Sequence, residues 1–131
     1  EMELTEKSGV LPSELSRGMK QKLSVAAALL HDPAVLILDE PLTGLDPAGI
    51  RRMKDTIRRR AERGTSVILS SHLLNLVEEL CTRVLLLRRG EVAALGTITE
   101  LRALRPELAT ASLEDLFIAL IDDATPAGRT A

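Results

Sequence analysis

The chain has 131 residues, of which 45% are apolar, so it can form one modest hydrophobic core. Its 17 basic and 19 acidic residues give a net charge of −2, which offers no overall attraction to nucleic acid or to an anionic membrane. Charges interrupt every apolar stretch well before the ~20 residues that span a bilayer. The single cysteine excludes an internal disulfide, and no signal-peptide pattern is present, so we expect a reducing, cytoplasmic setting.

The first third of the sequence predicts a helix and then a buried strand. Residues 1–9 are polar without a clear period, and the first residue is not methionine, which suggests an engineered or truncated start. Ser16 is a candidate N-cap, and proline ends the helix near Pro33. Its apolar residues recur at helical spacing, at Leu23, Ala26, Ala27 and Leu30. Val35–Leu38 is then a short apolar run between two prolines, which is typical of a strand buried in a parallel sheet.

A second helix and strand follow and complete a predicted βαβ unit. Asp46 and Pro47 suit the N-cap and first position of a helix that ends near Arg63, and Gly64 suits the left-handed residue beyond it. Ser66–Ser71 predicts another buried strand, parallel to the first, with a right-handed crossover. The inner face of the helix should comprise Ile50, Met53, Ile57 and Ala61.

The rest of the sequence predicts a hairpin among short helices. A helix over 73–80 precedes a strand over 84–87, and Arg89-Gly90-Glu91 turns the chain into a strand over 92–95. Thr97 or Thr99 caps a helix over 97–104, and Ser112 precedes a last helix over 113–121. Residues 122–131 are small and polar, and we expect a flexible tail.

Acidic and histidine side chains follow the two predicted strands. Asp39 and Glu40 end the first strand, and His72 follows the second. Ligands gather at the carboxyl ends of strands in open α/β sheets, where Asp39 can bind a cation or its water while Glu40 acts on a second water. Each feature also has a simpler interpretation, the carboxylates as a solvated turn and the histidine as a surface residue.

The start of the first helix is a second candidate for phosphate binding. Ser16-Arg17-Gly18-Met19 combines exposed backbone amides, a hydroxyl and a glycine that permits close approach. Taken alone, a serine at this position is most simply a helix cap.

Together these stretches resemble the motifs of the ATP-binding cassette (ABC) ATPase family. Residues 15–19 are similar to the signature motif, although that motif more often reads Leu-Ser-Gly-Gly-Gln. Val35–Glu40 resembles the Walker B strand with its catalytic glutamate, residues 42–46 resemble the D-loop, and His72 falls where the switch histidine belongs. The four motifs occur in the family's order, and the resemblance covers most of the chain except the tail.

The resemblance implies an α/β fold, a partial P-loop NTPase domain with parallel strands, crossover helices and a C-terminal hairpin and helices. Residues 1–121 would form the C-terminal part of the ATPase domain. Within it, residues 1–33 would end the helical subdomain, 34–96 would form half of the catalytic core, and 97–121 would be C-terminal helices.

The resemblance also implies ATP hydrolysis with ATP and Mg²⁺ as cofactors. Asp39 would hold the metal, Glu40 and His72 would be catalytic, and the nucleotide would be bound by Ser16, Arg17, Gly18, Met19 and Asp46. In the family two ATPase domains enclose two nucleotides head to tail, so the signature residues would contact the nucleotide of the opposite subunit. The implied partners are a second ATPase domain and a transmembrane permease on whose cytoplasmic face the protein lies, with an exporter, multidrug or ABC-2 transporter as the assembly.

The sequence departs from the family pattern in its phosphate-binding segment. No Gly-x-x-x-x-Gly-Lys-Ser/Thr stretch occurs in the 131 residues, so we expect the chain by itself to be inactive and to expose apolar surface that favours association. Two alternatives stay open: a non-enzymatic fragment, and a soluble ABC protein that acts on ribosomes or DNA. The basic helix over 47–63 fits nucleic acid less well than a solvated face, because acidic residues interrupt it and aromatic residues are absent.

Overall fold

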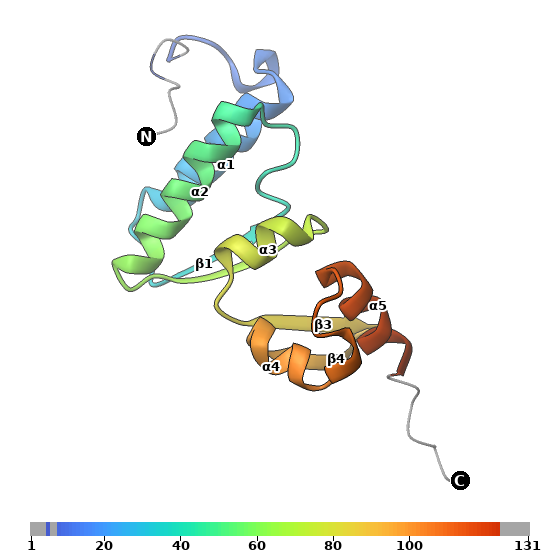
Figure 1. Ribbon diagram of the computed structural model, residues 1–131. Coiled ribbons are helices and arrows are strands. Elements are labelled where there is room, and N and C mark those ends of the chain that lie inside the picture. The colour runs from blue at the N-terminus through green and yellow to red at the C-terminus, as the bar shows by residue number, and fades with distance from the viewer. Residues whose placement is uncertain (1–4, 6–7, 124–131) are drawn as a thin grey trace, which may run out of the picture. The chain divides into compact units, whose positions relative to one another are not determined.

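The computed structural model describes Thr5 and residues 8–123, and the chain divides into two compact units, 1–72 and 73–131. The N-terminal unit contains the helices and strands η2 (Pro12–Glu14), α1 (Arg17–Leu29), β1 (Val35–Asp39), α2 (Pro47–Glu62) and β2 (Ser66–Ser70) (Figure 1). The C-terminal unit contains α3 (Leu74–Leu80), β3 (Val84–Arg88), β4 (Glu91–Gly96), α4 (Ile98–Ala103), η3 (Pro106–Leu108) and α5 (Leu113–Asp123). The unit boundary lies after His72, and the three-part division suggested by the ABC resemblance stays a prediction.

The predicted parallel strand pair is present in the N-terminal unit. β1 and β2 are paired in parallel from Val35 opposite Ser66 to Asp39 opposite Ser70, and α2 connects them. α1 packs against β1, and α2 packs against β2. Because the strands are parallel and in register, their carboxyl ends meet at one edge, where the candidate side chains follow.

The prediction that both strands are buried is correct only for one face of β1, because no residue of β2 is fully buried. Leu36 and Leu38 are buried, whereas Val35 and Ile37 are 55% and 72% exposed. Successive residues of a strand point to opposite faces, and α1 and α2 contact the sheet through only one of them. Ile68 of β2 is likewise 58% exposed, so the described residues leave an apolar face uncovered, as expected from the sequence. Association through this face stays a prediction.

The caps of α1 and α2 are those predicted, but the buried face of α1 is not. Ser16 and Asp46 are the N-caps, and Gly64 after α2 has a φ of 95°. In α1 the buried residues are Val25 and Leu29, while the predicted Ala27 and Leu30 are exposed. The helix is therefore turned by about one residue, or ~100°, from the predicted orientation.

The inner face of α2 follows the prediction more closely. Met53 and Ile57 are buried, together with the side chain of Thr56. The predicted Ile50 is half-buried, and Ala61 is exposed near the helix end.

The C-terminal unit contains the predicted hairpin. β3 and β4 are antiparallel, and Arg89 and Gly90 form the two-residue turn with φ values of 51° and 83°. Two positive φ values are what a type I′ turn requires, and its twist matches that of the strands it joins. A β-bulge interrupts the register between Leu86 and Leu87.

One apolar cluster forms the core of this unit. It comprises Val77, Val84, Leu86, Ala94, Leu101, Leu113, Leu116, Phe117 and Leu120. Thr97 and Glu100 form a reciprocal capping box at α4, so the cap is Thr97 rather than the alternative Thr99. α5 continues through Asp123, two residues beyond its predicted end, and the predicted tail from residue 124 onward lies outside the described residues.

Candidate functional site

The last residues of β1 and β2 bring two polar side chains together. Asp39 and Ser70 are paired across the parallel sheet, and the Ser70 hydroxyl donates a hydrogen bond to Asp39 Oδ1. Both side chains lie on the exposed face of the sheet. The strand register therefore places a carboxylate and a hydroxyl side by side at the carboxyl edge.

Glu40 leaves the strand in a left-handed conformation. Its φ is 44°, a value that is uncommon for a residue with a side chain. The Glu40 N–H donates to the backbone oxygen of Ser70 at 3.1 Å and also to Ser70 Oγ at 3.3 Å. The bend therefore comes at the point where the backbone of β1 is still bonded to β2.

The Glu40 carboxylate is held on both of its oxygens. Oε1 accepts a hydrogen bond from the backbone N–H of His72 at 2.9 Å and lies 2.8 Å from His72 Nδ1. Oε2 accepts from Thr43 Oγ1 at 3.4 Å. The sequence prediction that Glu40 and His72 share one sheet edge is confirmed by this geometry.

The pair remains accessible to a ligand. The Glu40 side chain is 34% exposed and that of His72 is 68% exposed. An imidazole that donates its Nδ1 proton to the carboxylate presents Nε2 on its open side, as an acceptor for water when the ring is neutral and as a donor to a phosphate oxygen when both nitrogens carry protons. A carboxylate oriented in this way can polarise a water molecule, and the imidazole can contact a phosphate or hold the water in place.

Asp39 fits a metal ion held through water rather than one enclosed by protein ligands. No group of three His, Cys, Asp or Glu side chains suited to a metal ion occurs among the residues that the structure describes. A Mg²⁺ ion on a nucleotide keeps several of its waters and needs only one or two carboxylates. A single exposed carboxylate with one oxygen fixed by Ser70 matches that requirement.

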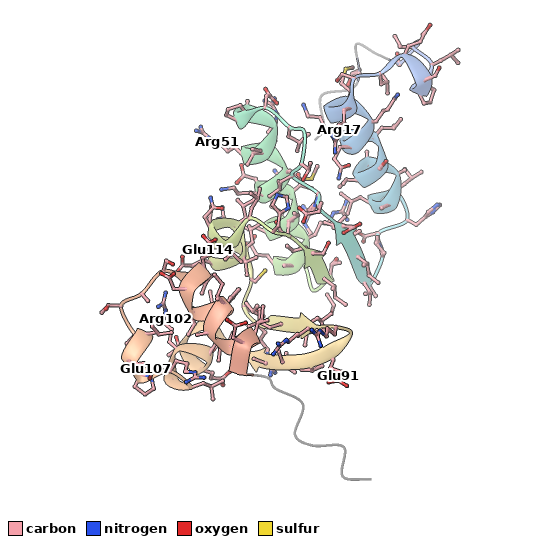
Figure 2. The ribbon with its side chains drawn as sticks, turned by 90° about the vertical axis from the view of Figure 1, so that its right-hand side faces the viewer. Arg17, Arg51, Glu91, Arg102, Glu107 and Glu114 are labelled. Carbon is pink, nitrogen blue, oxygen red and sulfur yellow. The ribbon has the colours of Figure 1, made fainter. Side chains whose placement is uncertain are left out.

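The signature-like residues pack directly against the loop over 42–46. Ser16 accepts a hydrogen bond from the Met19 N–H at 3.3 Å as the N-cap of α1. A Cβ at Gly18 would lie 2.7 Å from the Gly44 carbonyl oxygen, and the Arg17 side chain lies against Gly44. Figure 2 shows Arg17 at the start of α1. The start of this helix and the loop after Glu40 are therefore in backbone contact.

Asp46 acts locally as a helix cap. Its Oδ1 accepts a hydrogen bond from the Gly49 N–H at 3.0 Å, and a Cβ at Gly49 would lie 2.6 Å from the same oxygen. The contact of Asp46 with a second subunit, expected from the family resemblance, stays a prediction, as do the nucleotide contacts of Arg17 and Met19.

Two residues of this site were not identified from the sequence. Ser70 contacts Asp39 and the backbone of Glu40, and Thr43 contacts the Glu40 carboxylate. The signal for Thr43 is a hydroxyl three residues after the glutamate, within reach of a turn. The signal for Ser70 is a hydroxyl at the end of the second strand, which is informative only once the register is known.

Comparison with known proteins identifies the family. Residues 2–78 match the family model described as "AAA domain, putative AbiEii toxin, Type IV TA system". The chain belongs to this family. The curated relatives of the chain are ABC transporter ATP-binding proteins, which confirms the ABC resemblance.

The relatives are proteins considerably longer than the matched segment. The uncharacterized ABC transporter ATP-binding protein YhcH of Bacillus subtilis is 49% identical over 86 residues, which cover 65% of this chain and 28% of that protein. The ABC-type transporter ATP-binding protein EcsA of the same organism is 39% identical over 83% of this chain and 44% of its own length. The linearmycin resistance ATP-binding protein LnrL, also of B. subtilis, is 40% identical over 75% of this chain and 32% of its own length. The chain thus spans less than half the length of these relatives.

Solved structures confirm the predicted fold class of this ABC ATPase chain. The ATP-binding subunit of an ABC transporter is 35% identical, with a TM-score of 0.78 over 84% of this chain and 45% of that one. A dimeric, post-hydrolysis ATP-binding cassette bound to ADP and Pi is 26% identical, with a TM-score of 0.61 over 66% of this chain and 38% of that one. Both neighbours are P-loop NTPase domains. Among the described residues, no helix has the length and apolar character needed to cross a membrane.

Proposed function

We propose that the protein is the ATP-hydrolysing subunit of an ABC transporter and that this chain supplies the acidic and histidine side of its catalytic site. The observation that carries the proposal is the contact of Glu40 with His72, 2.8 Å apart, beside Asp39 at the carboxyl edge of a parallel strand pair. Relatives named as ABC transporter ATP-binding proteins support it.

In the proposed mechanism each side chain has one task. Glu40 orients and polarises the water that attacks the terminal phosphate. The hydrogen bonds from Thr43 and His72 to its two oxygens fix the orientation of the carboxylate towards that water. His72 would contact the terminal phosphate from the same edge, and Asp39 would hold a water of the bound metal ion. Mg²⁺, when bound with ATP, neutralises charge on the phosphates.

The start of α1 serves the nucleotide of a second ATPase domain. The α1 backbone amides and the Ser16 hydroxyl form an anion-binding surface, and the contact between Gly18 and Gly44 ties that surface to the loop that follows Glu40. A solved neighbour of this chain is dimeric, which supports a second ATPase domain as partner. The proposed assembly also includes a transmembrane permease, with the protein on its cytoplasmic face and an exported compound as cargo.

The proposal is tested by measuring ATP hydrolysis in a longer protein, in which a segment with the Gly-x-x-x-x-Gly-Lys-Ser/Thr loop precedes these 131 residues. We expect turnover of Mg·ATP there and none by the 131 residues alone, because these lack the Gly-x-x-x-x-Gly-Lys-Ser/Thr loop. Glu40→Gln should lower kcat at least ~100-fold, since it removes the group that polarises water. Glu62→Gln, at the exposed end of α2, is the matched control and should leave kcat unchanged. Equal kcat values for Glu40→Gln and wild type would contradict the proposal and favour a non-enzymatic role.

A further inference from the structure

The end of β2 contributes one side chain that touches both acidic residues of the site. We propose that Ser70 is a positioning residue for hydrolysis, which fixes the carboxylate of Asp39 and the left-handed backbone of Glu40 through a single hydroxyl. The inference rests on the proposed ATPase function, and it concerns a residue that contacts neither nucleotide nor water in that mechanism.

The hydroxyl of Ser70 can satisfy both contacts at once. A serine hydroxyl has one proton to donate and lone pairs that accept. Its proton goes to Asp39 Oδ1, and its lone pair accepts the Glu40 N–H at 3.3 Å. Alanine would lose both interactions, whereas threonine would keep the hydroxyl.

The hydrogen bond from Ser70 to Asp39 determines which carboxylate oxygen of Asp39 is available to a ligand. With Oδ1 engaged by Ser70, the carboxylate loses rotational freedom about its terminal bond, and Oδ2 would be the oxygen available to a metal-bound water. A carboxylate without this bond samples more orientations, so a smaller fraction of molecules is aligned for the reaction.

The second contact supports the strained bend at Glu40. If β1 continued as a strand, the side chain after Asp39 would point to the opposite face of the sheet. The φ of 44° ends the extended geometry at Glu40, whose carboxylate reaches His72 and Thr43. A strained conformation persists only where surrounding bonds hold it, and here Ser70 provides two acceptors, its backbone oxygen and its hydroxyl.

Ser66 provides a matched control within the same strand. It begins β2 on the same face of the sheet and is also exposed, but it is paired with Val35 rather than with a carboxylate. Ser66→Ala removes the same hydroxyl from the same strand without touching the acidic residues.

The effect of Ser70 on catalysis is measured by steady-state ATP hydrolysis in the longer protein that contains the phosphate-binding loop. For Ser70→Ala we expect kcat to fall about tenfold with KM for Mg·ATP within about twofold, since misorientation affects the reaction more than binding. Ser70→Thr should recover most of kcat, and Ser66→Ala should match wild type. A Ser70→Ala kcat within about twofold of Ser66→Ala, or a Ser70→Thr kcat as low as that of Ser70→Ala, would overturn the proposal.

Amide hydrogen exchange in the 131-residue chain separates this inference from the ATPase proposal. The Glu40 amide should exchange about threefold to tenfold faster in Ser70→Ala than in Ser66→Ala, as one of its two acceptors is lost. If wild type hydrolyses no ATP but Glu40 exchange accelerates, the ATPase function fails and the positioning contact stands. If Glu40→Gln abolishes turnover while Ser70→Ala changes neither kcat nor exchange, the function stands and the positioning role of Ser70 fails.

Discussion

The polar contacts at the sheet edge of the N-terminal unit and those of two arginines in the C-terminal unit serve different purposes. In the N-terminal unit they gather carboxylates, hydroxyls and an imidazole at one sheet edge and leave them partly exposed. In the C-terminal unit, by contrast, they satisfy backbone groups at helix ends. Arg88 donates to the carbonyl oxygens of Ile121 and Asp122 at the end of α5, at 2.6 and 3.2 Å, and Arg102 donates to those of Ala109 and Ala111 at 3.2 and 2.9 Å.

The charged side chains of the two units therefore have different roles, one in stability and the other in activity. A buried or terminal backbone carbonyl that finds no partner costs stability, so the arginines of the C-terminal unit stabilise its fold. The exposed charges of the N-terminal unit add little to stability by themselves, because solvent screens them. Their arrangement is better explained by the catalytic role proposed for them. Substitutions in the C-terminal unit should therefore change stability, and those at the sheet edge should change activity.

The largest stability effect is expected from the core of the C-terminal unit. Leu116 is 0% exposed within the apolar cluster, so Leu116→Ala should lower the free energy of unfolding by ~2–5 kcal/mol through lost burial and the cavity left behind. Ile118, on the same helix and 53% exposed, is the matched control, and Ile118→Ala should cost under ~0.5 kcal/mol. Urea denaturation measures both. Equal losses would show that α5 does not pack as described.

An intermediate effect is expected where α1 meets the loop over 42–46. A Cβ at Gly18 would lie 2.7 Å from the Gly44 carbonyl oxygen, a backbone atom that cannot rotate away. Overpacking costs ~1–3 kcal/mol, and the better helix propensity of alanine offsets up to ~1 kcal/mol. From a central cost of ~2 kcal/mol, Gly18→Ala should therefore destabilise by ~1–2 kcal/mol, measured by urea denaturation. Gly9→Ala is the control, because a Cβ added at Gly9 meets no neighbouring atom within 4 Å. If Gly18→Ala is as stable as Gly9→Ala, the close contact of Gly18 with Gly44 is excluded.

Local chemistry made the helix starts and the hairpin predictable. Ser16, Asp46 and Thr97 cap helices because a side-chain oxygen meets an amide only three residues away. The Arg89–Gly90 turn was likewise recognisable from its glycine between two apolar runs.

Contacts between distant residues explain the errors. The buried face of α1 was misassigned by about one residue, since alanines at 26 and 27 add little apolar area and the backbone contact of Gly18 with Gly44 helps to set the helix orientation. The exposure of Val35 and Ile37 depends on which sheet face the helices cover. Ser70 could not be recognised before the register placed it opposite Asp39, 31 residues away.

The smallest effect is expected at the capping box of α4, and it depends on pH. Glu100 Oε2 accepts the Thr97 N–H at 2.7 Å, and this bond, with that to the Thr97 side chain, lowers the pKa of the Glu100 carboxyl. A carboxyl whose folded pKa is depressed stabilises the fold above its unfolded pKa of about 4.3 and loses that contribution as pH falls through the folded value. Glu100→Gln should therefore be less stable than wild type at neutral pH and equal to it in acid. Thermal unfolding at a series of pH values measures the difference, with Glu91→Gln, an exposed residue that begins β4, as the control. A difference between Glu100→Gln and wild type that stays constant into acid would mean that the carboxylate charge contributes nothing to the cap.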